Sequence, residues 1–292
     1  MISLPKFDRS VSCLAWAYNE RPLVEPFLLR IHKLLSETVA DYEIVIVDDG
    51  STDGTGEIIR SLQERIPQIR LVTNPRNLNV GISTQRAIQA ATKEYLFWQT
   101  VDWAYDLSPL RLYLELLRDF DVIAGSRLGP IPRPWPWHRK LEGYLKMFRW
   151  GYLKIRSDTP AKALVSIVNY LLVRVLFGLP LTDYQNVVIY PTKLIQSIRF
   201  ESKSSFANPE ALLKAYWQGA RIVEVPIAFI PRATGEAKGT TLKAIGASVR
   251  DVFGLWFRWK VRGPMDFRLR GSVTRVEESG CVTEREAGRI PA

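Results

Sequence analysis

The chain has 292 residues, of which 47% are hydrophobic and 24% are charged, and its formal net charge is +10. This length supports a full hydrophobic core in one large domain, or in one domain with an appendage. The positive charge favours anionic partners such as nucleic acid, anionic lipid or phosphorylated ligands. Two cysteines exclude a disulfide framework and favour a reducing compartment. We expect no signal peptide and no transmembrane helix, because no uncharged apolar run reaches about 18 residues.

Apolar runs of strand length alternate with amphipathic helical patterns along most of the chain. The predicted strands are Val11–Ala15, Ile44–Val47, Ile69–Thr73, Tyr95–Trp98, Asp121–Gly125, Val187–Tyr190 and Ile222–Val225. The predicted helices are Pro22–Leu35, Gly56–Glu64, Gly81–Ala91, Leu107–Arg118, Ala161–Phe177, Pro209–Trp217 and Thr240–Trp259. This alternation predicts an α/β fold with a doubly wound, mostly parallel sheet and flanking helices. We expect a main domain over residues 1–239, an amphipathic helical segment over 240–262 and a flexible, irregular tail over 263–292.

One stretch combines a buried strand with acids. The residues from Ile44 to Val47 are all β-branched, which predicts a strand buried on both faces. Asp48 and Asp49 follow at its carboxyl end, where open α/β sheets bind ligands. A turn comes next, and one of three residues can cap the following helix: Ser51, Thr52 or Asp53. Taken alone, the stretch is either a solvated, capped turn or a ligand site.

Four blocks in a fixed order narrow this choice. Tyr18-Asn19-Glu20 follows the first strand, the block from Val45 to Thr55 closes the second, Arg76-Asn77 precedes a helix that begins with glycine, and Asp102 follows the fourth strand. This order resembles family 2 glycosyltransferases with the GT-A fold, especially the polyprenyl-phosphate branch that includes dolichol-phosphate mannose synthases. Three later blocks extend the resemblance from about Ser10 to about Lys243: Val168 to Asp183, Arg221 to Pro226 and Arg232 to Lys238.

The resemblance implies an inverting glycosyltransferase that moves a sugar from a UDP- or GDP-linked donor to an acceptor, with polyprenyl phosphate as the expected acceptor. Carboxylates suit the donor side because they accept hydrogen bonds from a base imide and from ribose hydroxyls. The family pattern places seven residues around the nucleotide: Ala17, Tyr18, Glu20, Asp48, Asp49, Arg76 and Gly81.

The metal-binding position departs from the family. Its members carry Asp-x-Asp, often with Gln two residues on, whereas this chain has Thr100-Val101-Asp102-Trp103-Ala104. Asp102 is therefore the one matching metal ligand, and Mg²⁺ or Mn²⁺ would bind weakly or be absent, because hard cations need several oxygen ligands. The resemblance makes Asp102, Arg232 and Lys238 the catalytic residues, with Arg232 and Lys238 on a loop that can close over the donor diphosphate.

The acceptor side is expected to be basic and apolar. Arg127, Arg156 and Ser166 match the family's phosphate-contacting positions, although a solvated basic face against acidic lipid is the alternative for each. The helices Ala161–Phe177 and Thr240–Trp259 either pack in the core or in a homo-oligomer, or lie on a membrane to meet a lipid-linked acceptor. With the positive charge, the second interpretation predicts a peripheral protein on the cytoplasmic face of a membrane.

Two other functional classes are the alternatives. Thr100 and Ala104 also suit a catalytically impaired relative that binds a nucleotide sugar or a lipid phosphate. Nucleic-acid binding is disfavoured, because the cations are scattered among apolar helices and no recognition motif is present.

Overall fold

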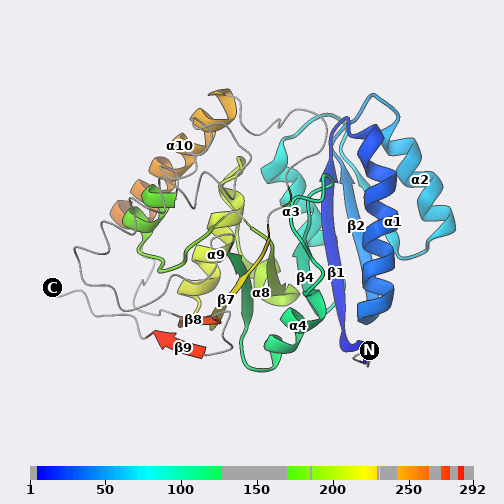
Figure 1. Ribbon diagram of the computed structural model, residues 1–292. Helices are drawn as coiled ribbons and strands as arrows, with labels where there is room; N and C mark the ends of the chain where they lie inside the picture. The colour runs from blue at the N-terminus through cyan, green and yellow to red at the C-terminus, as the bar shows by residue number, and fades with distance from the viewer. Residues whose placement is uncertain are drawn as a thin grey trace.

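The computed structural model describes residues 5–126, 170–184, 186–228, 230, 242–262, 271–276 and 282–285 (Figure 1). In these ranges the chain is an α/β protein, with helices packed on both faces of a central sheet. None of the helices in these ranges combines the length and apolar character that crossing a membrane requires.

Nine strands form a single sheet within the described residues, in the order β3-β2-β1-β4-β6-β5-β7-β8-β9. Their bounds are β1 Phe7–Ala17, β2 Val39–Asp48, β3 Ile69–Thr73, β4 Tyr95–Trp98, β5 Val122–Ser126, β6 Val188–Pro191, β7 Ile222–Pro226, β8 Val273–Val276 and β9 Val282–Arg285. β6 runs antiparallel to β4 and β5, and β9 runs antiparallel to β8. The other neighbouring pairs are parallel, so the predicted mostly parallel sheet is confirmed.

The helices cover the sheet from two sides. Their bounds are α1 Arg21–Thr38, α2 Thr55–Arg65, α3 Val80–Ala90, α4 Leu110–Glu115, α8 Thr192–Ser197, α9 Ala207–Trp217 and α10 Leu242–Phe257, with a 3-10 turn at Leu116–Arg118 and a π-helical turn at Arg258–Arg262. Residues 170–177 are also helical, and they are the described part of the predicted helix Ala161–Phe177.

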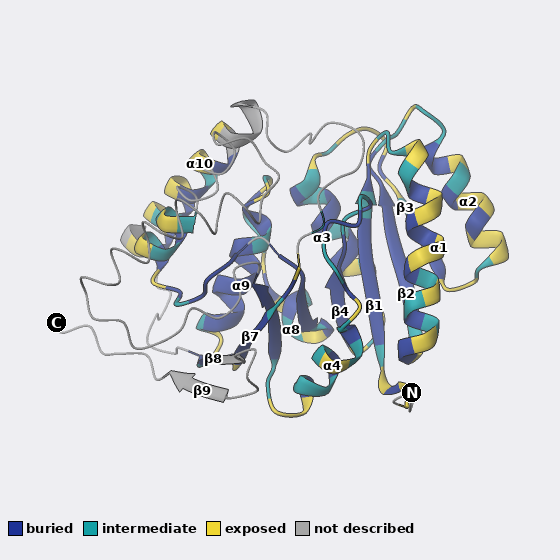
Figure 2. Ribbon diagram, viewed as in Figure 1, coloured by how far each residue is buried: buried dark blue, intermediate teal, exposed yellow. Residues whose placement is uncertain are grey.

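Strand alternation divides the core into two clusters. Val45 and Val47 point into the cluster that also holds side chains of α3, α9 and α10. Ile44 and Ile46 point into the cluster that holds side chains of α1, α2 and α4. All four side chains are fully buried, so this strand is covered on both faces as predicted (Figure 2). At about 25 cal/mol per Å² of apolar surface, such two-sided burial is the main force that holds β2 in the centre of its half of the sheet.

The carboxyl ends of β1, β2, β3 and β4 meet at one edge of the sheet. Ala17, Asp48 and Thr73 are in register at the ends of β1, β2 and β3. Because β6 is antiparallel, its beginning lies at the same edge, where the Val187 carbonyl accepts a hydrogen bond from Gly125 N at 2.9 Å. This edge is where a doubly wound sheet binds its ligand.

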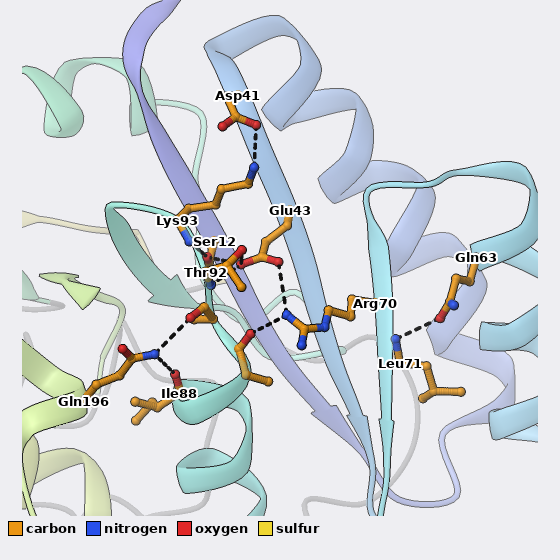
Figure 3. A network of polar contacts seen from close by, with 12 residues as sticks. Ser12, Asp41, Glu43, Gln63, Arg70, Leu71, Ile88, Thr92, Lys93 and Gln196 are labelled. Carbon is orange, nitrogen blue, oxygen red and sulfur yellow. Dashed lines mark hydrogen bonds and ion pairs between the residues drawn. The ribbon is translucent and has the colours of Figure 1, made fainter. Parts of the chain in front are cut away.

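A buried carboxylate network lies away from that edge, near the beginnings of β3 and β4 (Figure 3). Glu43 Oε1 accepts hydrogen bonds from Ser12 Oγ and from Thr92 N, both at 2.6 Å, and Arg70 lies 3.8 Å from Glu43 Oε2. These bonds satisfy a carboxylate that would otherwise be costly to bury. Glu43 therefore ties β1, β2 and the start of β4 together and is a structural acid.

Three expectations need correction. The helix predicted at Leu107–Arg118 begins only at Leu110, directly after Pro109, and turns 3-10 at Leu116. The short helix α8 was not expected, because six residues carry too little periodic signal. The irregular tail predicted beyond residue 262 is wrong for β8 and β9, which form a hairpin on the edge strand β7. Strand pairing with β7 supplies the order that their polar composition does not predict.

Candidate functional site

Asp49 organises the edge between β2 and β3. Its side chain is buried, and its Oδ1 atom accepts hydrogen bonds from Asn74 Nδ2 at 2.5 Å and from Leu78 N at 2.9 Å. Asn74 Nδ2 also donates to Ser83 Oγ at 3.0 Å, and the Arg86 guanidinium donates to Asn74 Oδ1 in the side-chain amide. One carboxylate thus fixes both ends of the loop 74–78, which carries the exposed side chain of Arg76.

A glycine brings this loop against the end of β2. Gly50 has a φ of 73°, and a Cβ atom there would lie 2.4 Å from the backbone carbon of Arg76. Only glycine tolerates both the left-handed backbone and this approach. The structure therefore brings the backbone of Gly50, the residue after Asp49, against the backbone of Arg76, and a shared ligand site of Asp49 and Arg76 stays a prediction.

A second set of bonds joins the ends of β1 and β2. Asp48 Oδ1 accepts a hydrogen bond from Ser51 N at 3.0 Å. Asn19 sits at a φ of 52°, a conformation that asparagine tolerates, and its Oδ1 accepts from Thr52 N at 2.9 Å. Ser51 Oγ in turn accepts from Asn19 N at 3.0 Å. The turn after β2 and the Tyr18-Asn19-Glu20 segment therefore form one rigid unit.

Asp53 links the first turns of two helices. Its Oδ1 accepts from Thr55 N at 3.0 Å, and its Oδ2 accepts from Arg21 N at 3.1 Å. Partial burial raises the pKa of the Asp53 carboxyl, but hydrogen bonds from Thr55 and Arg21 outweigh that effect and lower this pKa below its ordinary value. Of the three predicted caps of α2, Asp53 is the one that contacts the first residue of the helix, although the residue directly before the helix is Gly54.

The other predicted nucleotide residues differ in exposure. Ala17 is buried at the end of β1, Glu20 is half-buried, and the Tyr18 ring is 36% exposed beside them. Gly81 has a packing reason to be glycine, because a Cβ atom there would lie 2.4 Å from the backbone of Lys203. Of the predicted nucleotide residues, Tyr18 and Arg76 are thus the two whose side chains are exposed.

The turn after β4 is closed by its own neutral side chains. Gln99 is buried, donates from Nε2 to the Tyr105 carbonyl at 2.8 Å and accepts at Oε1 from Thr100 N at 2.9 Å. Thr100 Oγ1 accepts from Ala104 N at 3.1 Å, and the Thr100 carbonyl accepts from Trp103 N at 2.9 Å. These bonds define the Gln99–Tyr105 turn, which holds Asp102 at the end of β4.

Trp103 anchors this turn to α1. Its φ is 54°, a left-handed backbone that costs an L-residue about 1–2 kcal/mol. Its ring is 8% exposed, packs edge-to-face on Phe27 with centroids 6.1 Å apart, and lies under the Arg30 guanidinium at 4.0 Å. Burial of an indole together with a cation–π contact offsets the backbone strain.

The donor atoms near Asp102 do not fit a divalent cation held by the protein alone. Over the described ranges, no three histidine, cysteine or carboxylate side chains form a group that could hold a metal ion. Thr100 stands where the family has its first acid, and its hydroxyl oxygen already accepts the Ala104 N–H. Asp106, the next acid along, accepts from the backbone N and the hydroxyl of Ser108 before α4. The missing acid has thus been replaced by a structural hydrogen bond.

The segment after β7 lies against the Asp102 turn. Ile230 N donates to the Ala104 carbonyl at 2.8 Å, and Asp106 N donates to the Ala228 carbonyl at 2.9 Å. Five predicted residues lie outside the described residues: Arg127, Arg156, Ser166, Arg232 and Lys238.

Sequence reasoning missed a polar group at the ends of β5 and β7. Glu224 is buried in β7 and accepts hydrogen bonds from the backbone N and the hydroxyl of Thr182, both at 2.6 Å. The Thr182 hydroxyl contacts Ser126 Oγ at 2.7 Å, and Asn186 Nδ2 donates to Asp183 at 3.1 Å. The segment Leu181-Thr182-Asp183, which precedes β6, belongs to the block from Val168 to Asp183 that resembles the family. The resemblance assigned no role to these three residues.

Comparisons with known proteins show the family of this chain. The profile of the family described as glycosyl transferase family 2 matches residues 12–172. The undecaprenyl-phosphate mannosyltransferase of Micrococcus luteus is 26% identical over 254 residues, which are 83% of this chain and 93% of that protein. The dolichol-phosphate mannosyltransferase of Pyrococcus furiosus is 28% identical over 271 residues, which are 90% of this chain and 67% of that protein.

Solved structures show the same fold. A mannosyltransferase from Pyrobaculum calidifontis, in complex with GDP-Man and Mn²⁺, is 16% identical to this chain with a TM-score of 0.57. The matched region covers 92% of this chain and 70% of that protein's chain. The TarS protein of S. aureus, in complex with UDP-GlcNAc, is 17% identical with a TM-score of 0.54 and covers 86% of this chain and 67% of its own. The expected GT-A fold is thereby confirmed.

Proposed function

This chain belongs to glycosyl transferase family 2, and on that premise we propose that it moves a sugar from a nucleoside-diphosphate donor to a polyprenyl phosphate, with inversion at the anomeric carbon. The relatives named for undecaprenyl and dolichol phosphate support the acceptor, and the neighbours solved with GDP-Man or UDP-GlcNAc support the donor class.

The observation that carries the proposal is the apposition of Asp49 and the Arg76 loop. A buried carboxylate fixes the loop by two hydrogen bonds, and Gly50 lets the two backbones touch. Asp48, Ala17, Tyr18 and Glu20 complete the same edge. We assign recognition of the base and the ribose to this edge, because carboxylates accept from their imide and hydroxyl donors and the Tyr18 ring offers an aromatic face.

The reaction is a single displacement. An acceptor phosphate oxygen forms a bond to the anomeric carbon while the bond from that carbon to the donor diphosphate breaks, and the nucleoside diphosphate leaves with its negative charge. A phosphate monoester is already anionic, so no strong general base is needed. Asp102 lies at the sugar end of the site, and Arg232 and Lys238 stabilise the departing charge.

We assign the acceptor phosphate to Arg127, Arg156 and Ser166, and an apolar surface on two described helices suits its lipid chain. Five exposed side chains, which we call the apolar stripe, lie on the helix 170–177 and on α10: Leu171, Val175, Val249, Phe253 and Phe257. The two helices run next to one another, and Phe177 packs on Trp259 with ring centroids 5.6 Å apart (Figure 1).

A membrane surface is the occupant that suits the apolar stripe. Val249, Phe253 and Phe257 recur every four residues, so they share one face of α10. Arg250 and Lys260 are exposed on the same helical segment, and the chain carries a net charge of +10. Apolar side chains bordered by cations bind anionic bilayers. We therefore place the protein peripherally on the cytoplasmic face of a membrane, where a lipid-linked acceptor is within reach.

The test is transfer of label from UDP- and GDP-sugars to polyprenyl phosphate in mixed vesicles, with the purified full chain. We expect a lipid-linked sugar, and at least a tenfold loss of donor affinity in Asp49→Asn, because a hydrogen bond to a charged acceptor contributes about 1.5–3 kcal/mol. Asp41→Asn is the matched control, since Asp41 is exposed and pairs with Lys93 away from the site. Donor binding without any transfer would instead establish the catalytically impaired relative that Thr100 and Ala104 suggest.

A further inference from the structure

We propose that Lys203 is a further donor-binding residue, whose ammonium group contacts the diphosphate of the nucleotide donor, and that Asp251 of α10 is the positioning residue that holds it in place. The inference rests on the proposed function, because it adds a residue to the same nucleotide edge. Neither residue belongs to the blocks that carry the resemblance to the family.

The backbone of Lys203 lies against the first turn of α3. A Cβ atom on Gly81 would lie 2.4 Å from the Lys203 carbonyl carbon and 2.8 Å from its Cα atom, so the two backbones touch. Gly81 is the second residue of α3, which follows the loop 74–78 at the carboxyl end of β3. Lys203 therefore reaches the nucleotide edge from a distant part of the sequence.

Hydrogen bonds fix the chain on both sides of Lys203. Ser202 Oγ and Ser204 Oγ both donate to Asp251 Oδ2, each at 2.6 Å, and Ser204 N donates to the same atom at 3.2 Å. The Ser202 carbonyl accepts a hydrogen bond from Gln85 Nε2 at 3.0 Å. Side chains of α3 and α10 thus hold the backbone around Lys203 in one position, and this position is what Asp251 contributes.

The carboxylates next to Lys203 have other partners. Glu201 pairs with Lys214 at 3.1 Å and with Arg258 at 2.7 Å, and Asp251 accepts the three bonds from the two serines. The Lys203 side chain is exposed, and over the described ranges no carboxylate forms an ion pair with it. An ammonium group whose backbone is fixed and whose charge is unpaired is available to an anionic ligand.

The nucleotide edge needs such a charge. Two buried acids lie at the end of β2, and carboxylates repel a diphosphate unless positive charge faces it. Arg76 and Lys203 are exposed cations at the two ends of the stretch 76–81, which leads into α3: the backbone of Arg76 lies against Gly50, and the backbone of Lys203 lies against Gly81. An ammonium group binds phosphate as a compact point charge, so Lys203 suits the donor diphosphate.

The test is calorimetric titration of UDP and GDP into the full chain, with Mn²⁺ present throughout. Lys203→Ala should raise the dissociation constant of the preferred nucleotide by about tenfold, because hydrogen bonds between charged groups are the strong ones. Lys203→Arg keeps the charge and should stay within about threefold of the wild type. Lys193→Ala is the matched control and should change nothing, since Lys193 is exposed on α8, next to Pro191, which pairs with the beginning of β4 at the opposite edge of the sheet.

The nucleosides show which part of the donor Lys203 contacts. Uridine and guanosine lack phosphates, so Lys203→Ala should not change their affinity, measured by displacement of the bound nucleotide. Equal losses for nucleoside and nucleotide overturn the inference, as does an unchanged affinity for UDP and GDP, even if the KM for polyprenyl phosphate rises. If the wild type binds neither UDP nor GDP, the proposed function fails, and this inference fails with it.

A double-mutant cycle tests the positioning role of Asp251. Asp251→Asn should weaken nucleotide binding about threefold, because an amide accepts weaker hydrogen bonds than a carboxylate. The same change should have no further effect in Lys203→Ala, since both variants then remove one contact. Asp41→Asn, at an exposed acid that pairs with Lys93, is the control and should leave binding unchanged. Additive losses in the double variant would show that Asp251 does not act through Lys203.

Discussion

Two loops flank the end of β1, and they are held in place by different kinds of side chain. The loop after β2 carries two buried acids, Asp48 and Asp49, and each accepts backbone N–H groups from its surroundings. The turn after β4 is closed by an amide, a hydroxyl and an indole, and Asp102 is its one acid. The first loop keeps the family's residues, whereas the second keeps only the acid Asp102.

The two loops differ in whether their acids also hold the backbone in place. Asp48 and Asp49 have a structural role, because they accept hydrogen bonds from the turn after Asp48 and from the loop 74–78, and in our proposal they also recognise the donor nucleotide. In the turn after β4, the corresponding bond is made by a neutral side chain, because the Thr100 hydroxyl oxygen accepts the Ala104 N–H. A site residue with two functions is harder to replace than one with a single function.

The largest effect should come from removing Arg232, which we propose to stabilise the departing diphosphate. Arg232→Ala should lower kcat/KM for sugar transfer by about 10²–10³-fold, the usual result of deleting one charge-stabilising donor. Arg221→Ala is the control, because Arg221 pairs with Asp121 at the other end of β7 and should have no effect on the rate. Equal rates in the two variants would mean that a group other than Arg232 stabilises the charge of the leaving diphosphate.

The loop after β2 can be broken at its glycine. Gly50→Ala should destabilise the fold by about 3 kcal/mol, since the new Cβ atom clashes with the Arg76 backbone and φ is positive. Gly54→Ala has a similar φ of 93° but meets only the Arg21 side chain at 3.6 Å, so about 1 kcal/mol is expected. Chemical denaturation of the two variants measures the difference, and equal losses would contradict the close apposition of the two loops.

The membrane surface is tested at the apolar stripe. Phe253→Ser/Phe257→Ser should weaken binding to anionic vesicles by at least tenfold, because burying each phenyl ring contributes up to about 1.5–3 kcal/mol. Leu112→Ser is the control, since Leu112 is 59% exposed on α4, away from the stripe. If the double variant binds vesicles normally but changes from dimer to monomer in sedimentation, the stripe is instead an interface between two copies of the chain.

The smallest effect concerns the joint between the two helices at the nucleotide edge. Asp53→Ala should cost about 1 kcal/mol at neutral pH, as for other lost capping bonds, whereas the exposed Thr52→Ala should cost little. Because the folded-state pKa of Asp53 is lowered, its contribution is full above the unfolded pKa of about 3.9 and is lost as the pH falls through the folded value. Unfolding curves of the wild type and Asp53→Ala should therefore converge below about pH 4, and a constant gap at low pH would contradict the role of the carboxylate.

The sequence by itself determined the β-α-β order of the first half, and β3 and β4 have the predicted bounds. Continuous β-branched runs and amphipathic periods are local signals, so they predict strands and helices without knowledge of the segments that pack against them. The acids after β2 and the Tyr18-Asn19-Glu20 segment were found for the same reason: each follows a strand directly, and the ends of parallel strands meet at one edge.

Tertiary structure alone decided the rest. β8 pairs with the exposed edge of β7, and β9 pairs with β8. The polar sequence of these two strands does not predict this pairing. The contact between Trp103 and Arg30 joins residues more than 70 positions apart, and no local pattern predicts that an indole will turn into the core next to Arg30. The role of Thr100 also depended on the tertiary structure. The sequence shows only that an acid is missing at this position, whereas in the fold the Thr100 hydroxyl oxygen accepts the Ala104 N–H and closes the turn.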